Sequence, residues 1–232
     1  MAKKDITNTD LVKIEPITDN QKLVFDSYAK GQHQFMFGSA GTGKTFISLY
    51  LALSEVLRDD TKYDKVVLVR SLIPTREIGF LPGDEEDKAA LYQVPYQNMV
   101  KFMFEQPNEQ AFNMLYDRLK NQGSLYFLST SFLRGLTFDN SIIIVDECQN
   151  LNFHELDTII TRVGQNSKIC FAGDFFQTDL VKTNDKNGIV NFMNILRKMP
   201  SFGIIEFDIN DIVRSGLVKE YLLSKLEVDF NV

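Results

Sequence analysis

Short apolar runs recur along the chain and alternate with longer stretches in which apolar residues repeat at helical spacing. The runs are rich in β-branched and aromatic residues, which is typical of buried strands. Helical spacing follows the first and fourth runs, at residues 45–57 and 152–164. This alternation predicts an α/β fold with a parallel sheet and helices on both of its faces. The expected strands are residues 34–37, 65–69, 125–128, 142–145, 169–172 and 203–207.

The segment from Asp84 to Gln122 departs from this alternation, because it contains helix-like pieces with no strand between them. We interpret it as a helical insertion on the α/β core. The chain has no Gly/Ser/Pro-rich linker and no internal repeat, so we expect one domain over residues 1–232.

The composition is that of a folded globular protein, with 44% hydrophobic and 24% charged residues. A net charge of −6 argues against a surface coated with basic residues, although it leaves room for a local basic groove. No apolar run approaches the roughly 20 residues of a membrane-spanning helix, and no export signal is present, so we expect a cytoplasmic protein without a membrane partner. Cys148 and Cys170 are expected to be buried, reduced thiols rather than a redox pair.

The strongest chemical motif is GSAGTGKT, at residues 38–45. It fits the phosphate-loop pattern and lies between an expected strand and an amphipathic helix, the context in which this pattern forms a nucleotide site. Its glycines allow backbone N–H groups to turn toward phosphates at the start of the helix. Lys44 is expected to reach the β- and γ-phosphates and Thr45 to bind Mg²⁺; the alternative is a glycine-rich turn with a coincidental lysine. The expected nucleotide contacts are Gly38, Ser39, Ala40, Gly41, Thr42, Gly43, Lys44 and Thr45.

A second motif, IIIVDECQN, places two acids at the carboxyl end of another expected strand. Asp146 is expected to hold Mg²⁺ directly or through water, and Glu147 to act as the general base on the attacking water. A second carboxylate favours hydrolysis over phosphate transfer to an acceptor. The alternative is a pair of solvated acids at the end of a strand.

A third stretch, AGDFFQTD at residues 172–179, follows the next apolar run. If that run is the adjacent strand, Gln177 can contact the γ-phosphate or the attacking water and act as a switch. The alternative is a polar loop in which Phe175 and Phe176 pack inward.

Several motifs together resemble the PhoH family of ATPases, which in turn resembles the first RecA-like domain of superfamily-one helicases. They are the phosphate loop, DECQN, GDFFQ, EIGFLPGDEEDK, LRGLTF and NDIVRSGLV, and the likeness covers about Gln21 to Val218. The resemblance implies a three-layer, RecA-like P-loop NTPase that uses ATP and Mg²⁺. The chain departs from the family pattern at Cys148, where alanine is usual, and at Leu136, where arginine is usual.

The resemblance also assigns roles to residues outside the phosphate loop. Gln21 lies where helicase relatives recognise adenine, and an amide both donates and accepts hydrogen bonds; the alternative is a surface glutamine at a helix start. Arg214 is the candidate arginine finger, acting in cis or across a subunit interface, with a helix-surface salt bridge as the alternative. Because little chain follows Phe207, we expect a ring-like homo-oligomer, with a hexamer as one candidate, to complete the site.

The prediction of nucleic-acid binding rests on less evidence. Arg70, Arg76 and Arg134 lie in loops where helicase relatives bind nucleic-acid strands. The alternatives are that Arg70 belongs to the nucleotide site, or that these arginines pair with the acidic residues 84–87. We therefore expect a magnesium-dependent ATPase that acts on or with single-stranded RNA or DNA as a helicase-like motor. The rivals are a nucleotide or small-molecule kinase, and an ATP-gated assembly module with slow turnover.

Overall fold

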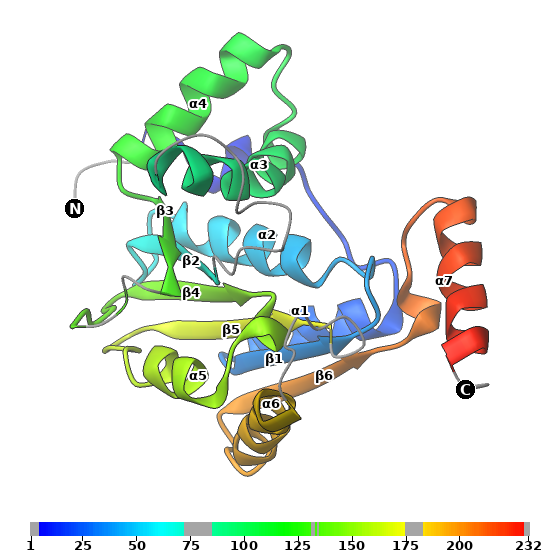
Figure 1. Ribbon diagram of the computed structural model, residues 1–232. Coiled ribbons are helices and arrows are strands. Elements are labelled where there is room, and N and C mark those ends of the chain that lie inside the picture. Colours follow the sequence, from blue (N-terminus) through cyan, green and yellow to red (C-terminus); the bar gives the residue numbers. More distant parts are fainter. Residues whose placement is uncertain (1–4, 72–84, 131–132, 134, 175–182, 230–232) are drawn as a thin grey trace.

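One parallel sheet forms the centre of the protein (Figure 1). The computed structural model describes residues 5–71, 85–130, 133, 135–174 and 183–229, without the side chains of 85–91, 183–187 and 225–229. Its strands run in the order β3-β2-β4-β5-β1-β6, and every neighbouring pair is parallel. The predicted α/β fold is confirmed, and each expected strand lies within an observed one. The strands are β1 (His33–Gly38), β2 (Lys65–Arg70), β3 (Leu125–Ser129), β4 (Ser141–Asp146), β5 (Lys168–Gly173) and β6 (Phe202–Phe207).

Helices cover both faces of the sheet, which gives three layers (Figure 1). Helices α1 to α4 contribute to the core on one face, whereas α5 and α6 pack on the other. Helix α7 stands apart from both layers in Figure 1. Among the described helices, none has both the length and the apolar character needed to cross a bilayer. The helices are α1 (Asp19–Ala29), α2 (Lys44–Val56), α3 (Glu85–Phe104), α4 (Glu109–Asn121), α5 (Phe153–Ile160), α6 (Thr183–Leu196) and α7 (Gly216–Asp229), with short 3₁₀ turns η1 (Asn8–Asp10), η4 (Cys148–Asn150) and η5 (Ile209–Asp211).

The central strands are apolar throughout because successive side chains enter opposite cores. In β2, Val66 and Leu68 belong to the core beneath α2, while Val67 and Val69 belong to the core beneath α5 and α6. Strands β4 and β5 are buried at every position. Continuous apolar runs, rather than alternating ones, are therefore what this sheet requires.

The insertion predicted over residues 84–122 contains α3 and α4, which connect β2 to β3. Asn108 begins α4, because its side-chain oxygen accepts a hydrogen bond from the Ala111 N–H at 2.9 Å. Helix α3 inserts Val100 and Met103, both 0% exposed, into the core that α2 also fills. The insertion is thus packed directly on the helix that follows the phosphate loop.

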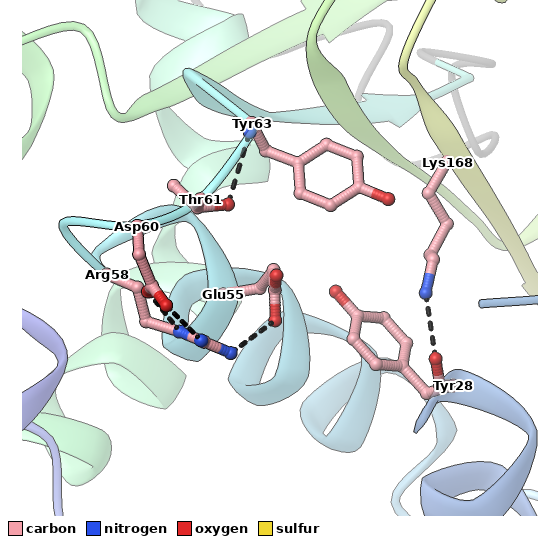
Figure 2. A network of polar contacts seen from close by, with 7 residues as sticks. All are labelled: Tyr28, Glu55, Arg58, Asp60, Thr61, Tyr63 and Lys168. Carbon is pink, nitrogen blue, oxygen red and sulfur yellow. Dashed lines mark hydrogen bonds and ion pairs between the residues drawn. The ribbon is translucent and has the colours of Figure 1, made fainter. Parts of the chain in front are cut away.

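A polar network holds the amino ends of the strands, away from the nucleotide motifs (Figure 2). The ammonium of Lys168, at the start of β5, donates to the Tyr28 carbonyl at 3.0 Å and lies 3.6 Å from the centre of the Tyr28 ring. This carbonyl belongs to the last turn of α1, where a cation complements the helix dipole. Beyond the end of α2, Arg58 donates to Asp60 at 2.9 and 2.8 Å and lies 3.6 Å from Glu55. Lys168 thus ties the end of α1 to the start of β5, whereas the contacts of Arg58 stay within the end of α2 and the turn that follows it.

The two cysteines are free and fully buried, which confirms the predicted buried thiols. Burial raises the pKa of the Cys170 thiol to about 12, and it also raises the pKa of Cys148. A thiolate is the reactive form of cysteine, so burial makes both side chains chemically inert.

Substituting Gly38 tests how closely the start of the phosphate loop packs against β6. Its φ is +120°, and a Cβ there would overlap the Phe207 carbonyl oxygen, whereas Gly31 has φ +79° and nothing near its Cβ position. We expect Gly31→Ala to cost only backbone strain, about 1–2 kcal/mol, and Gly38→Ala to add an overlap term of about 1–3 kcal/mol. Urea unfolding measures both; equal losses for the two variants would contradict this close packing.

Candidate functional site

The predicted residues Ala40 to Thr45, Asp146, Glu147 and Arg214 line one pocket at the carboxyl ends of the parallel strands, where open α/β sheets bind ligands, whereas Gly38, Ser39 and Gln21 are not part of its lining. The pocket has a volume of about 390 Å³. It lies where β1, β2, β4 and β5 end, and helix α3 of the insertion supplies part of its wall. The lining residues are Ala40, Gly41, Thr42, Gly43, Lys44, Thr45, Phe46, Arg70, Pro95, Tyr96, Met99, Asp146, Glu147, Gly173, Asp174 and Arg214.

The phosphate loop turns from β1 into α2 through glycines that adopt positive φ. Gly38, Gly41 and Gly43 have φ of 120°, 75° and 86°, a backbone region that residues with a Cβ rarely adopt. Gly43 is the N-cap residue of α2, so the helix begins at Lys44 within the pocket wall. The positive end of the α2 dipole and its first N–H groups therefore face the cavity, which favours a phosphate ligand.

Lys44 is buried at the base of this loop and is 8% exposed. Its ammonium donates to the carbonyl oxygens of Gly38 at 3.0 Å and Ser39 at 2.7 Å. Burial lowers the pKa of Lys44, and the nearby acids Asp174, Glu147 and Asp146 oppose that shift. A phosphate in the cavity would bring further negative charge to an ammonium that burial disfavours.

Asp146, at the end of β4, accepts a hydrogen bond at each of its carboxylate oxygens. The Thr45 hydroxyl donates to Oδ1 at 2.6 Å, and the Tyr96 hydroxyl donates to Oδ2 at 2.6 Å. Asp146 is 6% exposed, so these bonds offset the cost of burying its charge. A hydroxyl and a carboxylate are the hard oxygen ligands that Mg²⁺ prefers, so Thr45 and Asp146 fit a magnesium site beside the phosphates.

Glu147 follows Asp146 in a left-handed conformation, with φ 52° and ψ 40°, and lines the same pocket. Burial raises the pKa of Glu147, and the charge of Asp146 adds to the rise. The Gln149 amide donates to Glu147 Oε2 at 2.5 Å and favours the charged form. The Gln149 oxygen accepts from the Asp174 N–H at 2.9 Å, so this amide joins Glu147 to the residue after β5. A raised pKa with a fixed orientation suits a carboxylate that accepts protons.

Gln21 is buried against the phosphate loop, being 4% exposed. Its amide donates to the Thr42 carbonyl at 3.0 Å and accepts from the Ile17 N–H at 2.9 Å. The alternative of a surface glutamine is therefore wrong. Because an amide has two donors and two acceptor lone pairs, these contacts use one of each. Adenine recognition by Gln21 stays a prediction.

Arg214 lies on the phosphate loop of its own chain. A Cβ at Gly41 would come within 2.8 Å of Arg214 Cγ, and the Val213 N–H donates to the Gly41 carbonyl at 3.1 Å. Strand β6 pairs with β1 along its whole length, which brings the segment after β6 to this loop. The contact explains why residue 41 is a glycine.

Arg70 is also part of the pocket, where it interacts electrostatically with Tyr96, Asp146 and Glu147. Of the alternatives for Arg70, the structure favours membership of the nucleotide site. Gln177, Arg76 and Arg134, together with the acidic residues 84–87, are predictions that lie outside the described residues or side chains.

Sequence reasoning assigned no role to three polar residues of the site: Tyr96 and Asp174, which line the pocket, and Gln149, which contacts Glu147 and Asp174. Gln149 and Asp174 had a local signal, because each stands within a motif that follows an apolar strand. Tyr96 had none, since its partner Asp146 is 50 positions away along the chain. Only the packing of the insertion shows that this tyrosine belongs to the site.

The fold and the site together define a P-loop NTPase with a RecA-like core. The chain belongs to the PhoH family, because the family model described as PhoH-like protein matches residues 13–224.

Curated relatives agree with this assignment. The PhoH-like protein of Bacillus subtilis (strain 168) is 30% identical over 224 residues, which cover 96% of this chain and 67% of that protein. Protein PhoH2 of the same organism is 32% identical over 186 residues, covering 79% of this chain and 41% of PhoH2. Protein PhoH of Escherichia coli (strain K12) is 31% identical over 190 residues, which cover 81% of this chain and 51% of that protein. The chain thus spans 41% to 67% of the length of these relatives.

Solved structures show the same fold at low sequence identity. The large terminase of a thermophilic bacteriophage aligns with a TM-score of 0.53 at 12% identity, covering 89% of this chain and 50% of the terminase. Another crystal form of that terminase, in complex with ADP, aligns with a TM-score of 0.50 at 13% identity. The alignment covers 89% of this chain and 49% of the terminase. This likeness shows the fold of the chain.

Lys44→Met is expected to weaken binding of ADP about 10- to 100-fold, the range for losing a hydrogen bond to a charged group. Isothermal titration calorimetry in the presence of magnesium measures the change. Lys22→Met is the matched control, because Lys22 is an exposed lysine of α1. Unchanged affinity in Lys44→Met would place the phosphates elsewhere.

Proposed function

We propose that this chain is a magnesium-dependent ATPase that acts as one RecA-like domain. The observation that carries the proposal is the placement of Glu147, which shares a pocket with Lys44, Thr45 and Asp146 and is oriented by Gln149. A site that only bound nucleotide would need no carboxylate with a raised pKa facing the phosphate loop.

In this proposal the triphosphate lies in the loop over the N-terminus of α2. The loop N–H groups bind its oxygens, and Lys44 moves its ammonium from the loop carbonyls to the β- and γ-phosphates. Thr45 and Asp146 hold the magnesium ion, which when bound neutralises phosphate charge. The low exposure of both Lys44 and Asp146 strengthens each electrostatic contact.

Glu147 is the general base of the proposed reaction. Its carboxylate accepts a proton from the attacking water, which then forms the new bond to the γ-phosphorus as the bond to the β-phosphate oxygen breaks. The Gln149 amide keeps one carboxylate oxygen occupied, so the other is directed to the water. A kinase, by contrast, would bring an acceptor hydroxyl to this position.

Arg214 is proposed to stabilise the charge on the transferred phosphate from within the same chain, because its side chain lies against Gly41. We retain Gln177 as the proposed sensor of the γ-phosphate and Gln21 as the proposed reader of adenine. The contact between Gln21 and Thr42 supports the latter, since it places the amide at the loop.

We further propose that the protein works in the cytoplasm on single-stranded RNA or DNA, as the helicase-like motor that its family resemblance implies. Arg76 and Arg134 are the proposed strand contacts. A ring-like homo-oligomer is proposed as the working form. Helix α7 supports it, because Leu217, Val218 and Tyr221 are 77%, 40% and 64% exposed and offer apolar surface to another subunit.

Steady-state ATP turnover tests the proposed function. The unaltered chain is expected to release phosphate with magnesium, and to do so faster when its nucleic acid is present. Single-stranded RNA, single-stranded DNA and duplex are added separately. Glu147→Gln, which removes the base but keeps the shape of the side chain, is expected to lose roughly 10²- to 10⁴-fold in turnover while still binding ATP.

The outcomes separate the proposal from its rivals. Stimulation by one polymer supports a motor and identifies its track. Phosphate transfer to an acceptor with little hydrolysis would favour the kinase. Nucleotide-dependent oligomers that persist in Glu147→Gln, with slow turnover in the unaltered chain, would favour the assembly module.

The pH dependence of turnover tests the link between Gln149 and Glu147. Glu147 works when ionised, so activity is lost as the pH falls through its pKa, which burial has raised. Gln149→Leu removes the donor that favours the ionised form, so this acid limb is expected to move to higher pH. Gln110→Leu, at an exposed position of α4, is the control. If the acid limb of the pH profile does not move in Gln149→Leu, Gln149 does not stabilise the ionised form of Glu147.

A further inference from the structure

The helical insertion contacts the magnesium site through one side chain. Tyr96 belongs to α3, is 1% exposed, and donates its hydroxyl to Asp146 Oδ2 at 2.6 Å. The other carboxylate oxygen accepts from Thr45 at the same distance. Asp146 is therefore held between the helix of the phosphate loop and the helix of the insertion.

Arg70 extends this contact. Its guanidinium interacts electrostatically with Tyr96 and lies 5.7 Å from the centre of the Tyr92 ring. Tyr92 and Tyr96 are one helical turn apart, so they present adjacent side chains from one face of α3. Arg70 pairs with Asp146 across the β2 and β4 register. Arg70, Tyr96 and Asp146 thus lie together in the lining of the pocket.

We propose that Tyr96 is a positioning residue of the magnesium site, and that the insertion sets the magnesium affinity of the nucleotide complex through its hydroxyl. The inference rests on the proposed function for the identity of the metal site. Because Tyr96 donates to Oδ2 and Thr45 donates to Oδ1, the two hydrogen bonds hold the carboxylate of Asp146 in one orientation.

The surroundings of Tyr96 favour positioning over direct chemistry. Its ring packs 5.7 Å from the ring of Phe127 on β3, which restricts movement of the hydroxyl. Burial and the charge of Asp146 raise the pKa of the phenol, so it remains a hydrogen-bond donor throughout the working pH range.

Binding of a fluorescent ADP analogue tests the inference, measured once in EDTA and once across a magnesium titration. In Tyr96→Phe the affinity in EDTA is expected to match the unaltered chain. The magnesium concentration needed for half-maximal tightening is expected to rise about 10- to 100-fold, the range for partners that orient a metal ligand. Substituting Mn²⁺ and recording its EPR spectrum gives the metal affinity directly.

Tyr116→Phe is the matched control. It removes the hydroxyl of a buried tyrosine from the same insertion, at a position that is not part of the pocket lining. The inference predicts an unchanged magnesium titration for Tyr116→Phe. Equal shifts in the two variants would show a general loosening of the insertion, and no shift in Tyr96→Phe would overturn the proposal.

Turnover recorded in parallel keeps this inference separate from the proposed function. A tyrosine-dependent metal affinity in a chain without hydrolysis would leave the inference standing and overturn the ATPase. If the unaltered chain hydrolyses ATP but Tyr96→Phe has an unchanged magnesium titration, the ATPase proposal stands and the inference about Tyr96 is overturned.

A measurement on the unaltered chain covers the case in which Tyr96→Phe does not fold. The chain has 8 tyrosines, which can be labelled at Cζ with ¹³C. One of these signals is expected to move when magnesium joins the ADP complex, because Asp146 then shares its charge with the metal. A spectrum in which no signal moves would overturn the proposal.

Discussion

The carboxylate of Asp146 joins three parts of the chain that are far apart in sequence. One oxygen accepts a hydrogen bond from Thr45 in the first turn of α2, and the other accepts one from Tyr96 in the middle of α3. Asp146 itself is the last residue of the central strand β4. A carboxylate so deeply buried is stable only when both oxygens are satisfied. Asp146 therefore joins β4, the helix after the phosphate loop and the helix of the insertion at one point in the pocket.

The strands and the phosphate loop were predictable because their signals are local. A parallel strand buried on both faces must be apolar along its length, as residues 142–145 are, and the phosphate loop needs its glycines, lysine and threonine at fixed spacing. Asp146 and Glu147 followed from the rule that parallel strands present their carboxyl ends at one edge. The predicted insertion likewise coincides with α3 and α4.

The contacts between distant segments were not predictable, because one sequence does not reveal strand order. Arg214 reaches Gly41 only because β6 pairs with β1, and Tyr96 reaches Asp146 only because α3 folds over the end of β4. The burial of Gln21 has the same origin, since its partner Thr42 lies in the loop rather than in its own helix. The family resemblance singles out Gln21 and Arg214, but their contacts, like that of Tyr96, follow only from how the sheet and its helices pack.

The hydrogen bond between Val213 and Gly41 has a mechanical consequence. Helix α7 begins at Gly216, directly beyond this bond, and its 14 residues extend about 20 Å. The helix stands clear of the sheet layers in Figure 1, and its first turn is close to the bond between Val213 and Gly41. A small change in the direction of the chain at that bond would therefore displace the far end of α7 more than its first turn.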